Sequence, residues 1–210
     1  MQNYTITIAR GFGSGGKDIG RRLSKELNIP CYDREIITMA SDKSGIDESL
    51  FVETDERLRG RYISNFLRRL PQGLVIQPQE KSFISDNNLF NIQAEIIKSL
   101  AKTESCIIIG KCADQILKDF PNVLRVYIKA PYDTCAESIM NKMHVSRERA
   151  EELVRRTDRY RSKYYNYYSG GLDWTEPLNY DLVLNSDKLG REKCVEAIKA
   201  MIKIKINNIK

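Results

Sequence analysis

Short apolar runs alternate along the chain with longer segments in which apolar residues recur every three or four positions. The short runs are rich in β-branched residues and predict strands at 4–8, 105–110, 122–128 and 180–185. The helical spacing predicts helices at 17–27, 89–100, 111–118, 131–143, from Ser146 past Arg156, and at 191–203; residues 31–37 read as a short strand running into another helix. This alternation predicts an α/β fold with a parallel sheet and helices on both faces.

A glycine-rich loop joins the first predicted strand to the first predicted helix. It reads Ala9-Arg-Gly-Phe-Gly-Ser-Gly-Gly-Lys-Asp18 and has the glycine and lysine spacing of a P-loop. In a P-loop, backbone N–H groups and the positive end of the helix dipole bind an oxyanion, and the lysine reaches the nucleotide phosphates. The alternative is a tight strand-to-helix turn with a solvated lysine. We expect a phosphate site for ATP made of Gly11, Gly13, Ser14, Gly15, Gly16, Lys17 and Asp18.

Asp18 differs from the P-loop pattern, which has a serine or threonine hydroxyl here that helps to hold magnesium. Two interpretations stay open. Asp18 binds Mg²⁺ indirectly, through a water, or it faces solvent in the first turn of the helix, where an acidic side chain is favourable.

Three predicted loops follow strands of the same parallel sheet. They are the glycine loop, Gly110-Lys111 and Asn185-Ser-Asp187. Ligands of parallel sheets bind beyond the carboxyl ends of the strands. We therefore expect the three loops to open onto one crevice.

Residues 142–163 carry eight lysines and arginines against four acidic residues, which accounts for most of the net charge of +6. Arg155, Arg156 and Arg159 have the spacing of one helix side. Arginines on a movable helix suit phosphoryl transfer, whose transition state spreads negative charge over the transferred oxygens; the alternative is an exposed face of solvated charges. The following Tyr164–Gly171, with four tyrosines and a double glycine, indicates either a lid hinge or a surface that stacks on bases.

Composition narrows the class of protein. No apolar run is long enough to cross a membrane, and the amino-terminal residues lack the features of a signal peptide. The five cysteines are scattered without a C-x-x-C pair, as expected for reduced thiols, and the single histidine excludes a histidine-rich metal site. We expect a cytoplasmic protein without a membrane partner; the sequence gives no indication of its oligomeric state.

Several blocks together resemble the bacterial cytidylate kinase-like family: 6–27, 29–37, 106–114, 155–161 with its tyrosine tail, and 179–186. The resemblance implies a three-layer P-loop kinase fold within a single domain, 1–210. Its core would comprise 1–42, 86–145 and 176–210, with a substrate-binding insertion at about 43–85 and an arginine-bearing helical lid at about 146–175.

The resemblance also implies an activity, the transfer of the ATP γ-phosphate to CMP or dCMP with Mg²⁺. Carried over by motif, the catalytic residues are Lys17, Arg155, Arg159 and Arg161, and the acceptor-binding residues are Asp33, Lys111, Asp114 and Asp158. Three features depart from the family. Asp18-Ile19 follow the P-loop lysine, where glycine and threonine are usual, and lysine stands at 111, where arginine is commoner. The fuller Leu-Asp-Thr-Gly-Ala acceptor motif is missing.

Three alternatives remain beside a cytidylate kinase. The chain is a P-loop kinase for another small acceptor, a nucleotide-binding regulator without catalysis, or a single-strand nucleic-acid binder that uses residues 142–168. We rank the last lowest, because the same arginines already have a use opposite a P-loop.

Overall fold

The computed structural model of the chain describes residues 3–45 and 86–206. The chain divides into two compact units, one made of residues 1–33 and 97–210 and the other of residues 34–96. Almost all of the predicted insertion at 43–85 lies outside the described residues, so the predicted division into core, insertion and lid stays a prediction.

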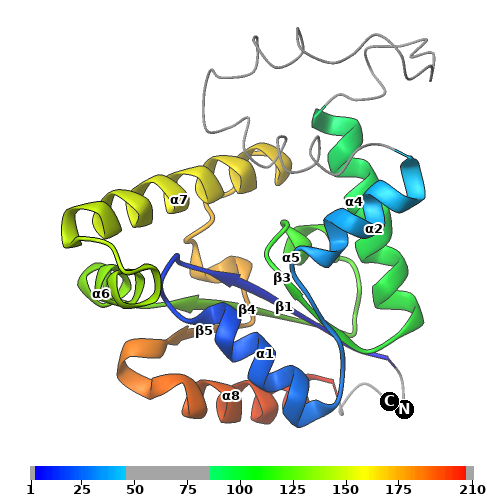
Figure 1. The fold of residues 1–210 in the computed structure, drawn as a ribbon. Helices are drawn as coiled ribbons and strands as arrows, with labels where there is room; N and C mark the ends of the chain where they lie inside the picture. The colour runs from blue at the N-terminus through cyan, green and yellow to red at the C-terminus, as the bar shows by residue number, and fades with distance from the viewer. Residues whose placement is uncertain (1–2, 46–85, 207–210) are drawn as a thin grey trace, which may run out of the picture. The chain divides into compact units, whose positions relative to one another are not determined.

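The first unit is built on a five-stranded sheet whose neighbouring strands are all parallel, in the order β2-β3-β1-β4-β5 (Figure 1). Its strands are β1 (Thr5–Arg10), β2 (Cys31–Tyr32), β3 (Cys106–Ile109), β4 (Val123–Lys129) and β5 (Leu182–Asn185). β1 lies in the middle, with Thr7 paired with Ile108 on one side and Arg125 on the other. The α/β fold predicted from the alternating pattern is confirmed.

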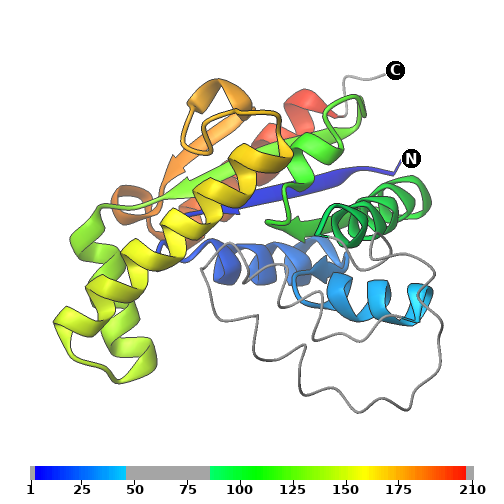
Figure 2. The same ribbon diagram turned by 90° about the horizontal axis from the view of Figure 1, so that it is seen from above.

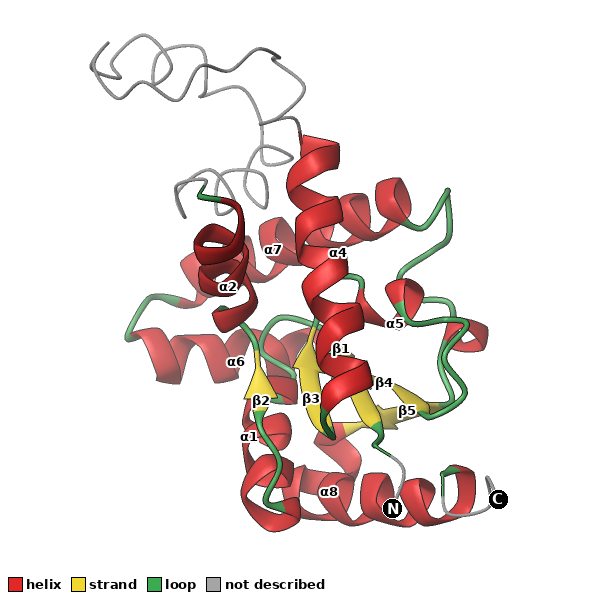
Figure 3. Cartoon of the chain, turned by 90° about the vertical axis from the view of Figure 1, so that its right-hand side faces the viewer, coloured by secondary structure: helices red, strands yellow, loops and turns green. Residues whose placement is uncertain are grey.

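Helices cover both faces of this sheet. In chain order they are α1 (Gly16–Leu27), the last part of α4 (Asp86–Thr103), α5 (Ala113–Ile116), α6 (Tyr132–Met143), α7 (Arg147–Tyr168) and α8 (Ser186–Lys205), with a short 3-10 turn at Pro177–Asn179. α1 and α8 lie side by side on one face and α5 lies on the other (Figure 3). In its described part, the second unit contains α2 (Glu35–Ser44) and the first part of α4.

The core of the first unit follows the apolar spacing of the sequence. Ile6 and Ile8 of β1 are fully buried in one cluster with Ile19 and Leu23 of α1. Ile198 of α8 belongs to the same cluster. All four residues of β3 are buried, as the continuous apolar run predicted for a strand covered on both faces.

One helix differs from its predicted bounds because of the backbone between strand and helix. The helix expected at 111–118 is shortened to α5, since Gly110, Lys111 and Cys112 take φ angles of 72°, 59° and 55°, which are not helical. In α8, Gly190 interrupts the helix with φ 74° and ψ 163°, so the regular helix runs from Arg191, as predicted.

Other helix boundaries were predicted correctly from capping residues. The Ser146 side chain accepts a hydrogen bond from the Arg149 N–H and begins α7, and Pro131 immediately precedes α6. Across residues 3–45 and 86–206, no helix is both long and apolar enough to cross a membrane.

Candidate active site

The glycine loop is held between two neighbouring elements of the first unit. The Gly11 N–H donates to the Ile128 carbonyl of β4 at 3.1 Å, and the Ser14 hydroxyl donates back to the Gly11 carbonyl at 2.9 Å. Gly13 has φ 89°, and a Cβ there would overlap the carbonyl oxygen of Cys135 in α6. The loop therefore follows its path only because this position has no side chain.

The loop leads directly into the amino terminus of α1. Gly15 is the N-cap residue, with φ 80°, and no side chain caps the helix. The first N–H groups of α1 therefore have no side-chain acceptor, which is the arrangement that binds an oxyanion at the positive end of a helix dipole. Lys17 lies in this first turn, as the P-loop pattern requires.

Lys17 contacts a carboxylate that follows β2. Its Nζ lies 2.5 Å from Asp33 Oδ2, and Arg10 Nη2 lies 3.7 Å from Asp33 Oδ1. Burial acts to raise the pKa of Asp33, but the hydrogen bond from Lys17 and the charges of Arg10 and Lys111 outweigh it, so this pKa lies below its ordinary value. Asp33 is thus an ionised group surrounded by three cations beside the loop.

Helix α7 contacts the loop through two residues one turn apart; Figure 2 shows this helix passing over the sheet near the carboxyl end of β1. Asp158 accepts a hydrogen bond from the Phe12 N–H at 2.8 Å, and Arg161 donates to the Arg10 carbonyl at 2.9 Å. Arg161 lies 3.5 Å from Asp158, and its guanidinium is 5.4 Å from the centre of the Phe12 ring. Asp158 thus accepts a hydrogen bond from the loop backbone, and its predicted role in binding the acceptor stays a prediction.

Burial governs the charges of this pair. It raises the pKa of Asp158, an effect that Arg161 and the Phe12 N–H partly offset. It lowers the pKa of Arg161 to about 9, assisted by the nearby charge of Arg10. Both residues therefore hold their charges at an energetic cost, which an anion beside Arg161 would reduce for the arginine.

The other predicted arginines of α7 are exposed. Arg155 lies 3.9 Å from Glu151, and its guanidinium is 6.0 Å from the centre of the Tyr132 ring. Arg156 and Arg159 make no ion pair with any described residue. The structure brings Arg161, and not Arg155 or Arg159, to the loop.

Asp114 lies in the interior and not where it was predicted to face an acceptor. It is 3% exposed and accepts hydrogen bonds from the Tyr165 hydroxyl at 2.7 Å and from Gln115 Nε2 at 3.3 Å. Burial raises its pKa. The physical reason is the positive-φ turn before α5, which places Asp114 on the shortened helix, where it bonds to α7. Lys111, in that turn, is half-buried, and its charge acts on Asp33.

Asp18 has two basic partners. Its carboxylate lies 3.1 Å from Arg191 Nη1 and 3.8 Å from Lys142 Nζ. These three residues line a hollow of about 500 Å³. Four further polar side chains of α6 complete its lining: Thr134, Glu137, Ser138 and Asn141. Within 3–45 and 86–206, no three histidine, cysteine or acidic side chains are grouped to hold a metal ion. Asp18 is thus ion-paired with α8 and α6 in this structure, and its predicted role as an indirect metal ligand stays a prediction.

The loop after β5 also reaches the glycine loop. The Ser186 hydroxyl lies within hydrogen-bonding distance of two carbonyls, Ser14 at 2.7 Å and Lys129 at 3.2 Å. The predicted convergence of loops at the carboxyl edge of the sheet is confirmed for this segment.

Two site residues were missed from the sequence. Arg10 is the last residue of β1 and carries its charge next to the loop. The sequence signal for it is a basic residue directly after a buried strand and directly before the P-loop. Arg191 directly follows the glycine that breaks α8, and its approach to Asp18 leaves no local sequence signal.

The family model of the "Cytidylate kinase-like family" matches residues 5–188 of this chain. The chain belongs to this family. The match includes every residue predicted for the site, from Gly11 to Arg161.

Curated relatives of this cytidylate kinase-like chain are archaeal. A cytidylate kinase of Methanosarcina barkeri is 32% identical over 113 residues, which are 52% of this chain and 59% of that protein. A cytidylate kinase of Methanosarcina mazei is 26% identical over 201 residues, covering 94% of this chain and 95% of that protein. The more similar relative is thus matched over little more than half its length.

Solved structures with the same fold include kinases of other small molecules. An uncharacterised protein from Eubacterium ventriosum superposes with a TM-score of 0.68 at 24% identity, over 96% of this chain and 99% of that one. A shikimate kinase from Bacteroides thetaiotaomicron gives a TM-score of 0.54 at 12% identity, over 95% and 98% of the two chains. At these identities the likeness shows the P-loop kinase fold alone.

Proposed function

We propose that this protein transfers the γ-phosphate of ATP to a nucleoside monophosphate, with CMP or dCMP as the acceptor. The observation that carries the proposal is the glycine loop with its uncapped helix terminus and Lys17, in a member of the cytidylate kinase-like family. The curated Methanosarcina relatives are named cytidylate kinases, which supports this acceptor over others.

The donor would bind at the loop and the adjoining cavity. The N–H groups of residues 13–17 and the start of α1 suit the ATP phosphates, and Lys17 would reach the β- and γ-phosphates. The open hollow beside Asp18, of about 500 Å³, adjoins the loop and would take the nucleoside half of ATP. Mg²⁺ brought in by ATP stays a prediction.

The acceptor would bind on the side of Asp33. Four cationic and two anionic groups face one another here, which leaves a net positive charge: Arg10, Lys17, Lys111, Arg161, Asp33 and Asp158. Because these six residues are only partly exposed, water screens the excess charge incompletely, and a phosphate dianion would offset it. The charge balance therefore favours an acceptor that already carries a phosphate.

Transfer requires the acceptor phosphate oxygen to attack the γ-phosphorus while the bond to the β-phosphate oxygen breaks and ADP leaves. Lys17 and Arg161 would stabilise the charge on the phosphoryl oxygens. Arg155 and Arg159, exposed on α7, would join them if this helix closes as a lid, a role that rests on the family resemblance and stays a prediction.

A second candidate acceptor is favoured by one contact. Asp33 is ionised and lies 2.5 Å from Lys17, and a carboxylate beside the phosphate loop suits a hydroxyl acceptor, whose proton it could accept, better than a phosphate dianion, which it would repel. The protein would then phosphorylate a small hydroxyl compound without a phosphate of its own.

Release of ADP from Mg-ATP by the purified protein separates the candidates. We expect turnover when CMP or dCMP is added and little with UMP, AMP or GMP. Turnover with shikimate or gluconate and with no pyrimidine monophosphate would favour the second candidate. ATP binding without turnover on any acceptor would indicate a regulator.

A further inference from the structure

We propose that Arg191 is a donor-binding residue and that Asp18 positions it. The inference deepens the proposed function and rests on its assignment of the donor site to the glycine loop. It gives Asp18 a role that does not involve a metal ion.

Arg191 is carried to the loop by a break in α8. The helix begins at Ser186, turns at Gly190 with φ 74° and ψ 163°, and continues from Arg191. The guanidinium then lies against the loop: a Cβ on Gly15 would stand 3.0 Å from Arg191 Nε. A Cβ at Gly15 would press on the Arg191 side chain, so the glycine, which its φ of 80° also favours, lets this arginine lie close to the loop.

Asp18 fixes the direction of this guanidinium. Its Oδ2 lies 3.1 Å from Arg191 Nη1, whereas Lys142 Nζ is more distant, at 3.8 Å from Oδ1. One contact to Asp18 leaves most of the five N–H donors of Arg191 for other acceptors. The side chain is 47% exposed, so a ligand can reach those donors.

Charge in the adjoining cavity indicates which part of the donor each residue meets. Asp18 and Glu137 carry two negative charges there, and Lys142 and Arg191 carry two positive charges. A cavity without net charge suits an uncharged nucleoside and not a polyphosphate. Arg191 lies both on this cavity and against Gly15 of the loop, so it stands where the nucleoside would join the phosphates.

The two roles of Asp18 differ in how they depend on magnesium. A metal ligand contributes to nucleotide affinity only when Mg²⁺ is present. A residue that positions Arg191 contributes whether or not the metal is present. Calorimetric titration of the full chain with ADP, once with MgCl₂ and once with EDTA, separates them without measuring activity.

We expect Arg191→Gln to weaken ADP binding about tenfold or more in both buffers, because it removes a charged hydrogen-bond donor from the phosphates. Asp18→Asn is expected to weaken ADP binding severalfold in both buffers. The double variant is expected to bind no more weakly than Arg191→Gln alone, since Asp18 acts through Arg191. Arg191→Lys is expected to restore part of the loss, because it keeps the charge but not the planar fork.

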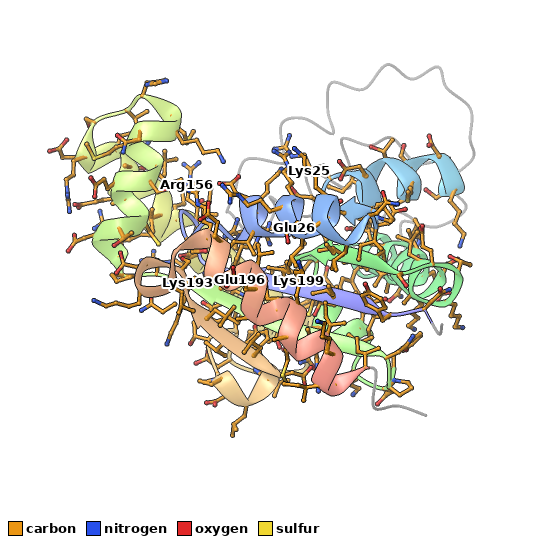
Figure 4. All side chains as sticks on the ribbon, turned by 90° about the horizontal axis from the view of Figure 1, so that it is seen from below. Lys25, Glu26, Arg156, Lys193, Glu196 and Lys199 are labelled. Atoms are coloured by element: carbon orange, nitrogen blue, oxygen red, sulfur yellow. The ribbon has the colours of Figure 1, made fainter. Side chains whose placement is uncertain are left out.

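A matched control is the ion pair between Glu26 of α1 and Lys199 of α8, at 2.8 Å (Figure 4). Glu26→Gln breaks an ion pair between the same two helices away from the loop, so we expect unchanged ADP affinity. An Asp18→Asn loss confined to MgCl₂, or Arg191→Gln affinity equal to wild type, would overturn the inference while leaving the proposed function intact. A wild-type chain that binds no ADP in either buffer would overturn the donor site itself, and with it the proposed function.

Discussion

Substituting alanine at Gly13 tests whether the glycine loop is held in its phosphate-binding path by close packing. Gly13 has φ 89°, and a Cβ at this position would stand 2.9 Å from both the Cα and the carbonyl carbon of Cys135 and overlap its carbonyl oxygen. These are backbone atoms of α6, which cannot rotate away as the end of a side chain could. Gly13→Ala is therefore expected to move the loop.

The cost has two parts. A residue with a Cβ pays roughly 1–2 kcal/mol to occupy the left-handed region, and overlap with a packed backbone adds about 1–3 kcal/mol. Reduced freedom of the unfolded chain returns about 0.4–1 kcal/mol. We expect Gly13→Ala to lower the free energy of unfolding by about 2–4 kcal/mol.

Gly170 supplies the matched control, because it has φ 76° and a Cβ there meets no atom within 4 Å. Gly170→Ala carries the backbone cost without the overlap, so we expect a loss of only about 1 kcal/mol. Urea unfolding measures both variants, and ADP titration is expected to show weaker binding for Gly13→Ala alone. Equal destabilisation of the two variants would refute the packing argument.

Three further predictions concern charged residues of the site. Lys17→Ala is expected to abolish ADP release with CMP while circular dichroism keeps the wild-type signal; retained turnover would remove this lysine from the mechanism. Arg159→Ala is expected to lower kcat by on the order of 10³-fold while the free energy of unfolding stays within about 0.5 kcal/mol of wild type. Arg149→Ala, another exposed arginine of α7, is the control. A loss of ATP affinity alone would contradict the role of Arg159 in transfer. Because the folded-state pKa of Asp33 is lowered, its stabilisation is present above the unfolded value of 3.8 and is lost as the pH falls through the folded one. The difference in unfolding free energy between wild type and Asp33→Asn is therefore expected to be constant above about pH 5 and to shrink below it; a difference independent of pH would contradict the ion pair with Lys17.

Local patterns in the sequence were sufficient for most of the fold. The apolar run at β3 and the helical spacing at α1 predict which of their residues are buried. Ser146 marks the start of α7, where its side chain caps the helix. The helix after β3 was predicted too long, because Lys111 and Cys112 adopt positive φ angles that non-glycine residues rarely take.

The site was predictable where one segment makes it and not where distant segments meet. The glycine loop and Lys17 follow from a contiguous motif. Arg191 contacts Asp18 although the two are 173 positions apart in the sequence. The Phe12 N–H of the loop donates to Asp158 of α7. Such contacts depend on tertiary packing, so residue type alone could not distinguish Arg161, which holds the loop, from the exposed Arg155 and Arg159.

Transfer of the terminal phosphate of ATP to CMP is tested most directly with ATP labelled at the γ-phosphate. The protein is incubated with labelled Mg-ATP and CMP, and the products are separated by chromatography, with Lys17→Ala in parallel. The proposed function predicts that the label appears in CDP with wild-type protein and not with the variant. Label found only in inorganic phosphate, or remaining in ATP, would contradict it.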